Sequence, residues 1–200
     1  MTETNGATVR NGAGAKSPTI VLAALDFNEP LRTIIRELRA AQLSVISVTL
    51  NAGQCDQDHQ KRLLDISGEL GSLILGGFSL GARIAAQLCS KGTALGLLGI
   101  GFPFHLPHDP SVCHGLQSLL QVNIPTQIIQ GTRDNHGSQP AVRGYPLTES
   151  ISVVWMADAN HRLVPRSRSV YSHQQHLAAA ARHAVSFVNS MGNRDGGDRD

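Results

Sequence analysis

The segment Gly77-Phe78-Ser79-Leu80-Gly81 places a serine between two glycines, each two positions away from it. It joins an apolar run over 72–78, typical of a strand, to a run of small residues over 80–89, typical of a helix. A serine on such a turn is held in a strained backbone conformation, and the glycines let strand and helix cross closely. The segment predicts Ser79 as a nucleophile, with a helix N-cap as the alternative role.

A base and an acid follow Ser79 in the order that a Ser-Asp-His triad requires. Asp134 comes just after an apolar run over 126–130, and His161 follows another over 151–156. Functional groups collect on the loops that leave the carboxyl ends of parallel strands. We therefore predict that His161 takes the proton of the Ser79 hydroxyl and that Asp134 orients the imidazole.

The same loops should supply the groups that bind the substrate. The backbone N–H of Leu80 is predicted to point at the developing oxyanion, and a second donor is expected from Ala24 or Leu25. Phe78 and His105 are predicted to line the substrate pocket. No metal and no organic cofactor is implied by this arrangement.

Each catalytic assignment has a structural alternative. Asp134 could close an Asx-turn, and His161 could be a histidine on a solvated loop. Asp158 is a rival acid, although it lies three residues before His161 on the same loop, an awkward place from which to orient the ring.

Two further groups of residues could do chemistry. Imidazole and thiolate side chains that could bind zinc occur at His105, His108, Cys113 and His114. Their irregular spacing and the nearby prolines favour a loop beside the cleft instead. Three arginines could attract an anionic substrate, although a solvated basic edge is the simpler interpretation: Arg162, Arg166 and Arg168. The histidines at 173, 176 and 183 are expected to face water.

Apolar runs that alternate with helical patterns should position these residues. Strands are predicted over 19–25, 44–50, 72–78, 95–101, 126–130 and 151–156. Helices are predicted over 29–41, 57–64, 80–90 and about 168–189. The first helix has Asn28 as its N-cap and apolar residues at helical spacing behind it. The alternation predicts an α/β fold with a mostly parallel sheet of about six strands, helices on both faces and no lid domain.

Composition limits the classes of function. The 200 residues are 41% hydrophobic and 16% charged, which suits one domain, expected over 18–190 between flexible tails at 1–17 and 191–200. A net charge of +2 with few aromatic residues argues against nucleic-acid binding. Three cysteines without disulfide spacing and a polar N-terminal stretch favour a reduced, cytoplasmic protein. The apolar run over 20–25 is too short to cross a membrane. The oligomeric state is left open.

Four segments in order resemble one family of proteins. They are Gly76-Gly77-Phe78-Ser79-Leu80-Gly81-Ala82-Arg83, Gly101-Phe102-Pro103-Phe104-His105, Gln130-Gly131-Thr132-Arg133-Asp134 and Asn160-His161. The chain resembles the small α/β-hydrolase-like family of testis-expressed hydrolase-like proteins and the hydrolase-like subunit of the non-specific-lethal chromatin complex, which is related to dienelactone hydrolases. The resemblance implies an α/β-hydrolase fold with Ser79, Asp134 and His161 as the triad.

The front of the chain departs from that family. Members usually carry His-Gly-Ala-Gly after the first central strand, where this chain has Ala24-Leu25-Asp26-Phe27-Asn28-Glu29. Two hypotheses follow from this difference. The first is a serine hydrolase that cleaves a small ester or thioester through an acyl-enzyme. The second is a catalytically silent protein of the same fold that binds a small ligand or a partner protein.

Overall fold

The structure is a computed structural model that describes residues 17–68, 70–92 and 94–192. The tails predicted over 1–17 and 191–200 therefore lie almost wholly outside the described residues. At the C-terminal side the boundary is corrected, because the last helix continues to Gly192 and the Met191 side chain is buried.

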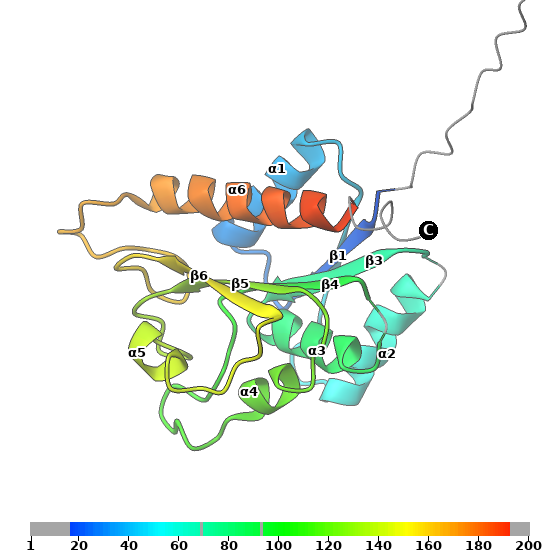
Figure 1. Ribbon diagram of the computed structural model, residues 1–200, viewed down its shortest axis with the longest axis horizontal. Coiled ribbons are helices and arrows are strands. Elements are labelled where there is room, and N and C mark those ends of the chain that lie inside the picture. The colour runs from blue at the N-terminus through cyan, green and yellow to red at the C-terminus, as the bar shows by residue number, and fades with distance from the viewer. Residues whose placement is uncertain (1–16, 69, 93, 193–200) are drawn as a thin grey trace, which may run out of the picture.

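Six strands form one parallel sheet in the order β2-β1-β3-β4-β5-β6 (Figure 1). Their bounds are β1 (Thr19–Ala24), β2 (Val45–Thr49), β3 (Leu73–Phe78), β4 (Gly96–Ile100), β5 (Thr126–Gly131) and β6 (Ile151–Met156). All residues of β3 and β4 are buried, as expected of strands covered on both faces. The predicted parallel sheet is confirmed, and the loops after β3, β5 and β6 leave it at the same edge.

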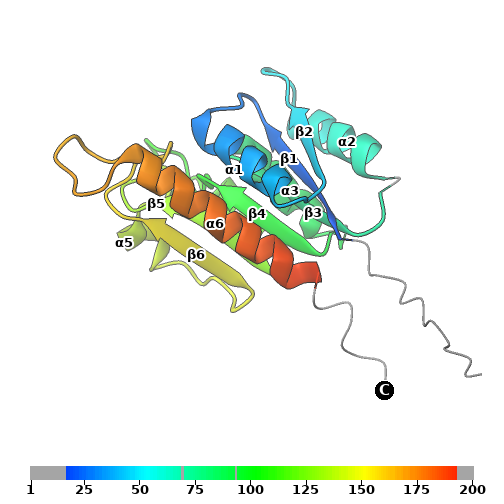
Figure 2. The same cartoon turned by 90° about the horizontal axis from the view of Figure 1, so that it is seen from above.

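Helices cover both faces of the sheet. Figure 1 shows α1 (Glu29–Ala40) and α6 (His173–Gly192) on one face, and Figure 2 shows these two lying side by side. On the other face lie α2 (Asp56–Ser67), α3 (Leu80–Cys89) and α4 (His114–Leu119). Each layer packs its apolar side chains on the sheet, so there are two buried cores with the sheet between them.

The start of α1 follows its sequence pattern closely. Asn28 Oδ1 accepts a hydrogen bond from the Leu31 N–H at 3.2 Å, which is the predicted N-cap. Leu31, Ile34 and Leu38 are fully buried against the sheet. The residues just before α1 also border the pocket described below, so this N-cap helps to fix the position of the pocket wall.

The start of α6 lies five residues later than the predicted position of about 168. Ser172 and Gln175 form a capping box: Ser172 Oγ accepts the Gln175 N–H at 3.2 Å, and Gln175 Oε1 accepts the Ser172 N–H at 2.7 Å. Two short helices were not predicted, namely α4 and α5 (Gln139–Val142), because four to six residues are too few to show helical periodicity.

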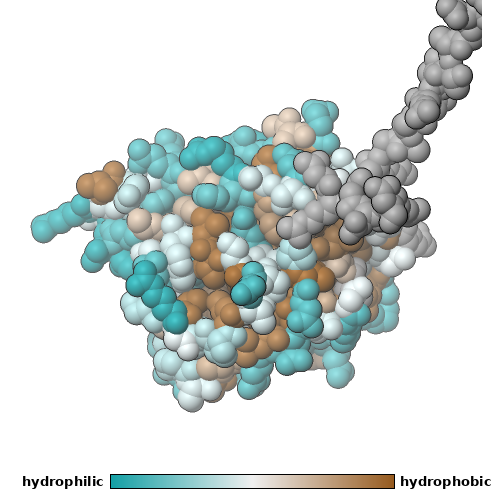
Figure 3. All heavy atoms as spheres, viewed as in Figure 1, coloured by the Kyte–Doolittle hydropathy of each residue, from teal (hydrophilic) through white to brown (hydrophobic). Residues whose placement is uncertain are grey.

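The strand β6 forms one edge of the sheet, and Val153, Val154 and Trp155 are only partly buried there. Apolar surface is visible across the middle of the face shown in Figure 3, where Figure 1 places this edge. Within the described residues, no helix has both the length and the apolar character that a membrane span requires.

Candidate active site

Ser79 lies on the sharp turn between β3 and α3, where its backbone has φ 52° and ψ −115°. A positive φ is unusual for a residue with a side chain and marks local strain. A Cβ atom at Gly77 would lie 2.0 Å from the carbonyl oxygen of Ala23, and one at Gly81 would lie 1.8 Å from the same oxygen. Both glycines are therefore needed because β1 passes directly against this turn.

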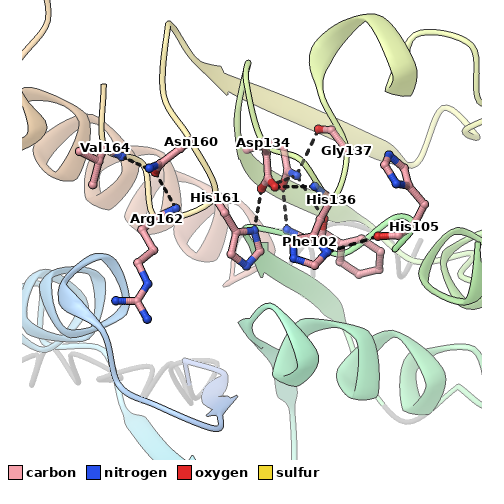
Figure 4. Close-up of polar contacts among 10 residues, drawn as sticks. Phe102, His105, Asp134, His136, Gly137, Asn160, His161, Arg162 and Val164 are labelled. Carbon is pink, nitrogen blue, oxygen red and sulfur yellow. Dashed lines mark hydrogen bonds and ion pairs between the residues drawn. The ribbon is translucent and has the colours of Figure 1, made fainter. Parts of the chain in front are cut away.

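The predicted acid and base lie in contact. Asp134 Oδ2 accepts a hydrogen bond from His161 Nδ1 at 2.8 Å (Figure 4). The Asp134 side chain is fully buried, while the His161 side chain is 20% exposed. The two residues come from the loops after β5 and β6, which are neighbours in the sheet. This contact assigns the proton on the imidazole to Nδ1 and leaves Nε2 as the acceptor.

The buried carboxylate of Asp134 has further donors. Oδ1 accepts the backbone N–H of His136 at 2.8 Å, and Oδ2 also accepts Nε2 of Gln130 at 2.9 Å. Gln130 is itself fully buried, and its Oε1 accepts the Phe102 N–H at 2.7 Å. Because each carboxylate oxygen is hydrogen-bonded, neither oxygen is left as an unsatisfied acceptor in the interior. Sequence reasoning did not identify Gln130 as part of this network.

The loop that carries His161 is held by its neighbours. Asn160 Oδ1 accepts the backbone N–H groups of Arg162 and Val164 at 2.9 and 3.0 Å, as Figure 4 shows. The rival acid Asp158 pairs elsewhere, because its carboxylate lies 2.6 Å from Arg166 Nη2 and 3.7 Å from Arg133 Nη1. The contact to His161 comes from Asp134 and not from Asp158.

Ser79 and His161 line one pocket of about 280 Å³. Of the other predicted residues, Leu80, Leu25 and Phe78 also line it, whereas Ala24 does not. The Phe78 ring meets the His161 ring edge-on, with the ring centroids 4.9 Å apart. Among the described residues no hydrogen bond joins Ser79 Oγ to His161, although both face the same pocket.

The predicted oxyanion donors differ in their placement. Leu80 is the first residue of α3, where backbone N–H groups have no partner within the helix, and it lies directly beside Ser79. Leu25 lines the pocket as well, and it is followed by Asp26, which is exposed and lines the same pocket. Glu29 lies away from the pocket, because it borders a separate hollow between α1 and α6.

His136 is a neighbour of the predicted triad that sequence reasoning missed. Its ring centroid lies 4.6 Å from that of His161, and its Nδ1 lies 3.3 Å from the carbonyl oxygen of His105. Burial and the nearby His161 lower the pKa of His136 below its ordinary value. Its position two residues after Asp134 was the only available signal, and it becomes informative only once the acid is known.

Other predicted residues find different surroundings. His105 is buried and lines a groove beside the triad, outside the pocket of Ser79. Cys113 Sγ donates to the carbonyl of Pro110, and within the described ranges no group of three metal-ligating side chains occurs. The expectation that His176 faces water is wrong: it is 4% exposed, and its Nε2 lies 2.8 Å from the carbonyl oxygen of Ala157.

Comparisons with known proteins agree with this fold. The sequence profile of a family described as an alpha/beta hydrolase domain matches residues 52–189. No curated protein matches the chain in sequence.

Solved structures of the same fold are numerous. An alpha-beta serine hydrolase homologue from Coxiella burnetii is 19% identical with a TM-score of 0.61, and the match covers 86% of this chain and 85% of that one. Est1E from Butyrivibrio proteoclasticus is 10% identical with a TM-score of 0.67, covering 88% and 89%. A monoacylglycerol lipase from Paleococcus ferrophilus is 12% identical with a TM-score of 0.61, covering 88% and 96%. At these identities the likeness shows the fold, which is the predicted one.

Proposed function

Because the chain belongs to the α/β-hydrolase domain family, we propose that it is a serine hydrolase that cleaves a small ester or thioester. Ser79 is the nucleophile, His161 the general base and acid, and Asp134 the residue that orients the imidazole. The observation that carries the proposal is the hydrogen bond from His161 to the buried Asp134, beside the pocket that holds Ser79.

The reaction follows from these positions. His161 Nε2 takes the hydroxyl proton of Ser79 as Oγ attacks the carbonyl carbon of the substrate. The oxyanion that forms is stabilised by the N–H of Leu80 and by a donor from Leu25. The C–O or C–S bond then breaks, and His161 returns the proton to the leaving alcohol or thiol. Water, deprotonated by His161, attacks the acyl group and releases the acid and free Ser79.

A second candidate function is a silent member of the family that binds a small ligand. The observation that supports this second function is that Asp26 lines the pocket of Ser79. A carboxylate there opposes a developing oxyanion by like-charge repulsion. The part of the pocket that Leu25 lines would then serve ligand binding and not catalysis.

The remaining features of the proposal are less specific. From their resemblance in four motif segments, we propose that the testis-expressed hydrolase-like proteins are relatives of this chain within the family. All three cysteines are free, which fits a reduced cytoplasmic setting: Cys55, Cys89 and Cys113. No nucleic-acid partner and no membrane partner is proposed.

A fluorophosphonate probe tests the proposed function without knowledge of the substrate. We expect the probe to label the wild type and to fail with Ser79→Ala, while Ser152→Ala, an exposed serine on β6, labels like the wild type. The same variants are then assayed on short acyl esters and thioesters, where Ser79→Ala should lose nearly all turnover. An unlabelled wild type would instead favour the silent binder.

A further inference from the structure

A groove of about 770 Å³ lies beside the triad and is separate from the pocket of Ser79. It begins at His136, whose ring packs against that of His161, and it continues between α2, α3 and α4. The side chains that line it are mostly polar. Those used below are Asp56, Gln60, Arg83, Gln87, Lys91 and His105.

The groove follows the axis of α3 away from the nucleophile. Arg83 is one helical turn from Ser79, since its backbone N–H donates to the carbonyl of Ser79 at 3.1 Å. Gln87 follows four residues later, and Lys91 lies another four residues on, just past the helix end. Eight residues at the helical rise span about 12 Å, so Lys91 marks the far end of an elongated site.

The polar side chains of the groove hold one another in a ladder. Asp56 accepts two hydrogen bonds from the Arg83 guanidinium, one of them 2.8 Å long. It also accepts Gln87 Nε2 at 2.9 Å. Gln60 Nε2 donates to Gln87 Oε1 at 2.8 Å, and Lys91 Nζ donates to Gln60 Oε1 at 2.9 Å. The groove wall is therefore organised before any ligand arrives.

Within this ladder, a larger share of the hydrogen-bond acceptors than of the donors has a partner. The Asp56 carboxylate and both amide oxygens accept hydrogen bonds within it. Among the described residues, the ammonium of Lys91 uses one of its three N–H bonds, and each amide nitrogen uses one of its two. Among the described residues, the hydrogen-bonding positions of the groove wall that have no partner are thus mainly N–H groups. Such a wall favours a ligand rich in acceptor oxygens.

The charges lead to the same conclusion. Asp56 and Arg83 neutralise each other as an ion pair. The Arg83 guanidinium also lowers the pKa of the Asp56 carboxyl, so that carboxyl stays ionised in the pair. Lys91 adds one positive charge, with a neutral amide as its partner in the ladder. The far end of the groove is therefore positive and donor-rich.

We propose that this groove binds the distal arm of the substrate, and that the arm ends in an anionic group such as a phosphate or carboxylate held by Lys91. The inference rests on the proposed function for the ester or thioester that the arm carries. His105 and His136 line the end of the groove nearest the predicted triad, and the arm enters the groove there, past the contact between His136 and His161, from the scissile bond in the pocket of Ser79.

Binding of uncleavable analogues tests this proposal without any need for turnover. The probes are thioethers in which a short acyl-like group carries a linear arm of about 18 Å, the helical rise over the twelve residues from Ser79 to Lys91, and the arm ends in phosphate, carboxylate or a neutral hydroxyl. Titration calorimetry on the full chain should show tighter binding of both anionic arms than of the neutral arm. The stronger of the two anions identifies the terminal group.

Matched lysine variants locate the contact. Lys91→Gln should reduce the preference for the anionic arms about fivefold, and Lys91→Arg should retain most of it. Lys61→Gln removes an exposed lysine of α2 that pairs with Asp65 outside the groove, and it should leave the preference unchanged. Raising the salt concentration should weaken the anionic arms selectively.

Two results would overturn the inference: equal binding of the anionic and neutral arms by the wild type, or an unchanged preference in Lys91→Gln. Fluorophosphonate labelling is measured on the same preparations. Labelling at Ser79 without an anionic preference leaves the hydrolase and rejects the groove as an anion site. An anionic preference without labelling supports the groove as a ligand site and rejects the hydrolase.

Discussion

At the scale of single residues, two aspartates compete for the role of orienting His161. Asp134 is buried, and its Oδ2 lies 2.8 Å from His161 Nδ1. Asp158 instead pairs with arginines of two loops. In the proposed mechanism, this difference in partners means that only Asp134 can stabilise the imidazolium that forms when His161 takes the proton of Ser79.

Substitution of each acid by its amide separates these roles. Asp134→Asn keeps the shape of the side chain but cannot hold the imidazole in its reactive tautomer, so kcat should fall by about 10⁴-fold. Asp158→Asn removes only ion pairs at the loop surface, and its effect should stay below about tenfold. Both are measured as initial rates on the best short ester, with thermal unfolding as a check that each variant folds. Equal losses in the two variants would contradict the assignment.

The residues proposed as the triad could be singled out in the sequence because their types and order are distinctive. Ser79, Asp134 and His161 each follow an apolar strand, and parallel strands bring such loops together. Gln130 and His136 were not readable, because a buried glutamine within a strand and a histidine within a turn have no pattern of their own. Their roles depend on contacts across the sheet that only the folded chain makes.

At the scale of elements, the crossing of β1 with the turn between β3 and α3 determines where Ser79 lies. Gly77 and Gly81 both face the carbonyl of Ala23, so the approach is limited by backbone atoms that cannot rotate away. The glycines of the serine motif are thus requirements of packing between elements. The sequence predicted a close crossing of the strand and helix that flank Ser79, but not the approach of β1.

Gly81→Ala tests this crossing. Its Cβ would lie 1.8 Å from the Ala23 oxygen, so we expect the free energy of unfolding to fall by at least about 2 kcal/mol. A Cβ at Gly71 meets nothing within 4 Å, and Gly71→Ala should change stability by less than about 1 kcal/mol. Urea unfolding compares the two variants with the wild type. A Gly81→Ala protein as stable as Gly71→Ala would mean that the elements are farther apart than described.

The capping box of α6 makes a second prediction at this scale. Ser172→Ala removes the acceptor of the Gln175 N–H, which should cost about 1 kcal/mol of stability. Ser167→Ala, an exposed serine outside the helix, should have little effect. Urea midpoints of the two variants measure the difference. Equal midpoints would show that the box does not stabilise the start of α6.

Helix starts and short helices show where sequence prediction fails. The strand bounds were predicted to within about one residue, because apolar runs end where burial ends. The start of α6 was placed too early, since Arg168 and Val170 were included in the predicted helix although the Ser172-Gln175 capping box lies after them. The short α4 leaves almost no periodicity in the sequence, yet it forms one wall of the groove.

At the scale of the whole molecule, the alternation of strands and helices was sufficient to predict a parallel sheet with two helical layers. It could not predict which surfaces stay hollow. The pocket of Ser79 depends on the segment between β1 and α1, and the neighbouring groove depends on where α2, α3 and α4 fail to meet. Each hollow forms where elements distant in the sequence leave space between them, so no local sequence pattern predicts it.

The burial of His136 beside His161 links the site to the acid stability of the whole molecule. Burial lowers the pKa of His136 from its ordinary 6.5, so in a range just below that value the unfolded chain binds a proton at this residue and the folded chain does not. Stability must therefore rise with pH through this range and level off above it. Equivalently, lowering the pH below about 6.5 decreases the free energy of unfolding.

His136→Gln should remove this part of the pH dependence. The free energy of unfolding from urea titrations is compared at about pH 7.5 and about pH 5.5 for the wild type and the variant. The wild type should lose more stability between the two pH values, because only its folded state must exclude a proton at residue 136. Asp56, the acid paired with Arg83, has a pKa lowered from 3.8, so its contribution is lost at lower pH and does not enter this comparison. An equal loss in both proteins would show that residue 136 titrates alike in the folded and unfolded chains. Burial and the neighbouring His161 would then not favour the neutral form of the His136 imidazole.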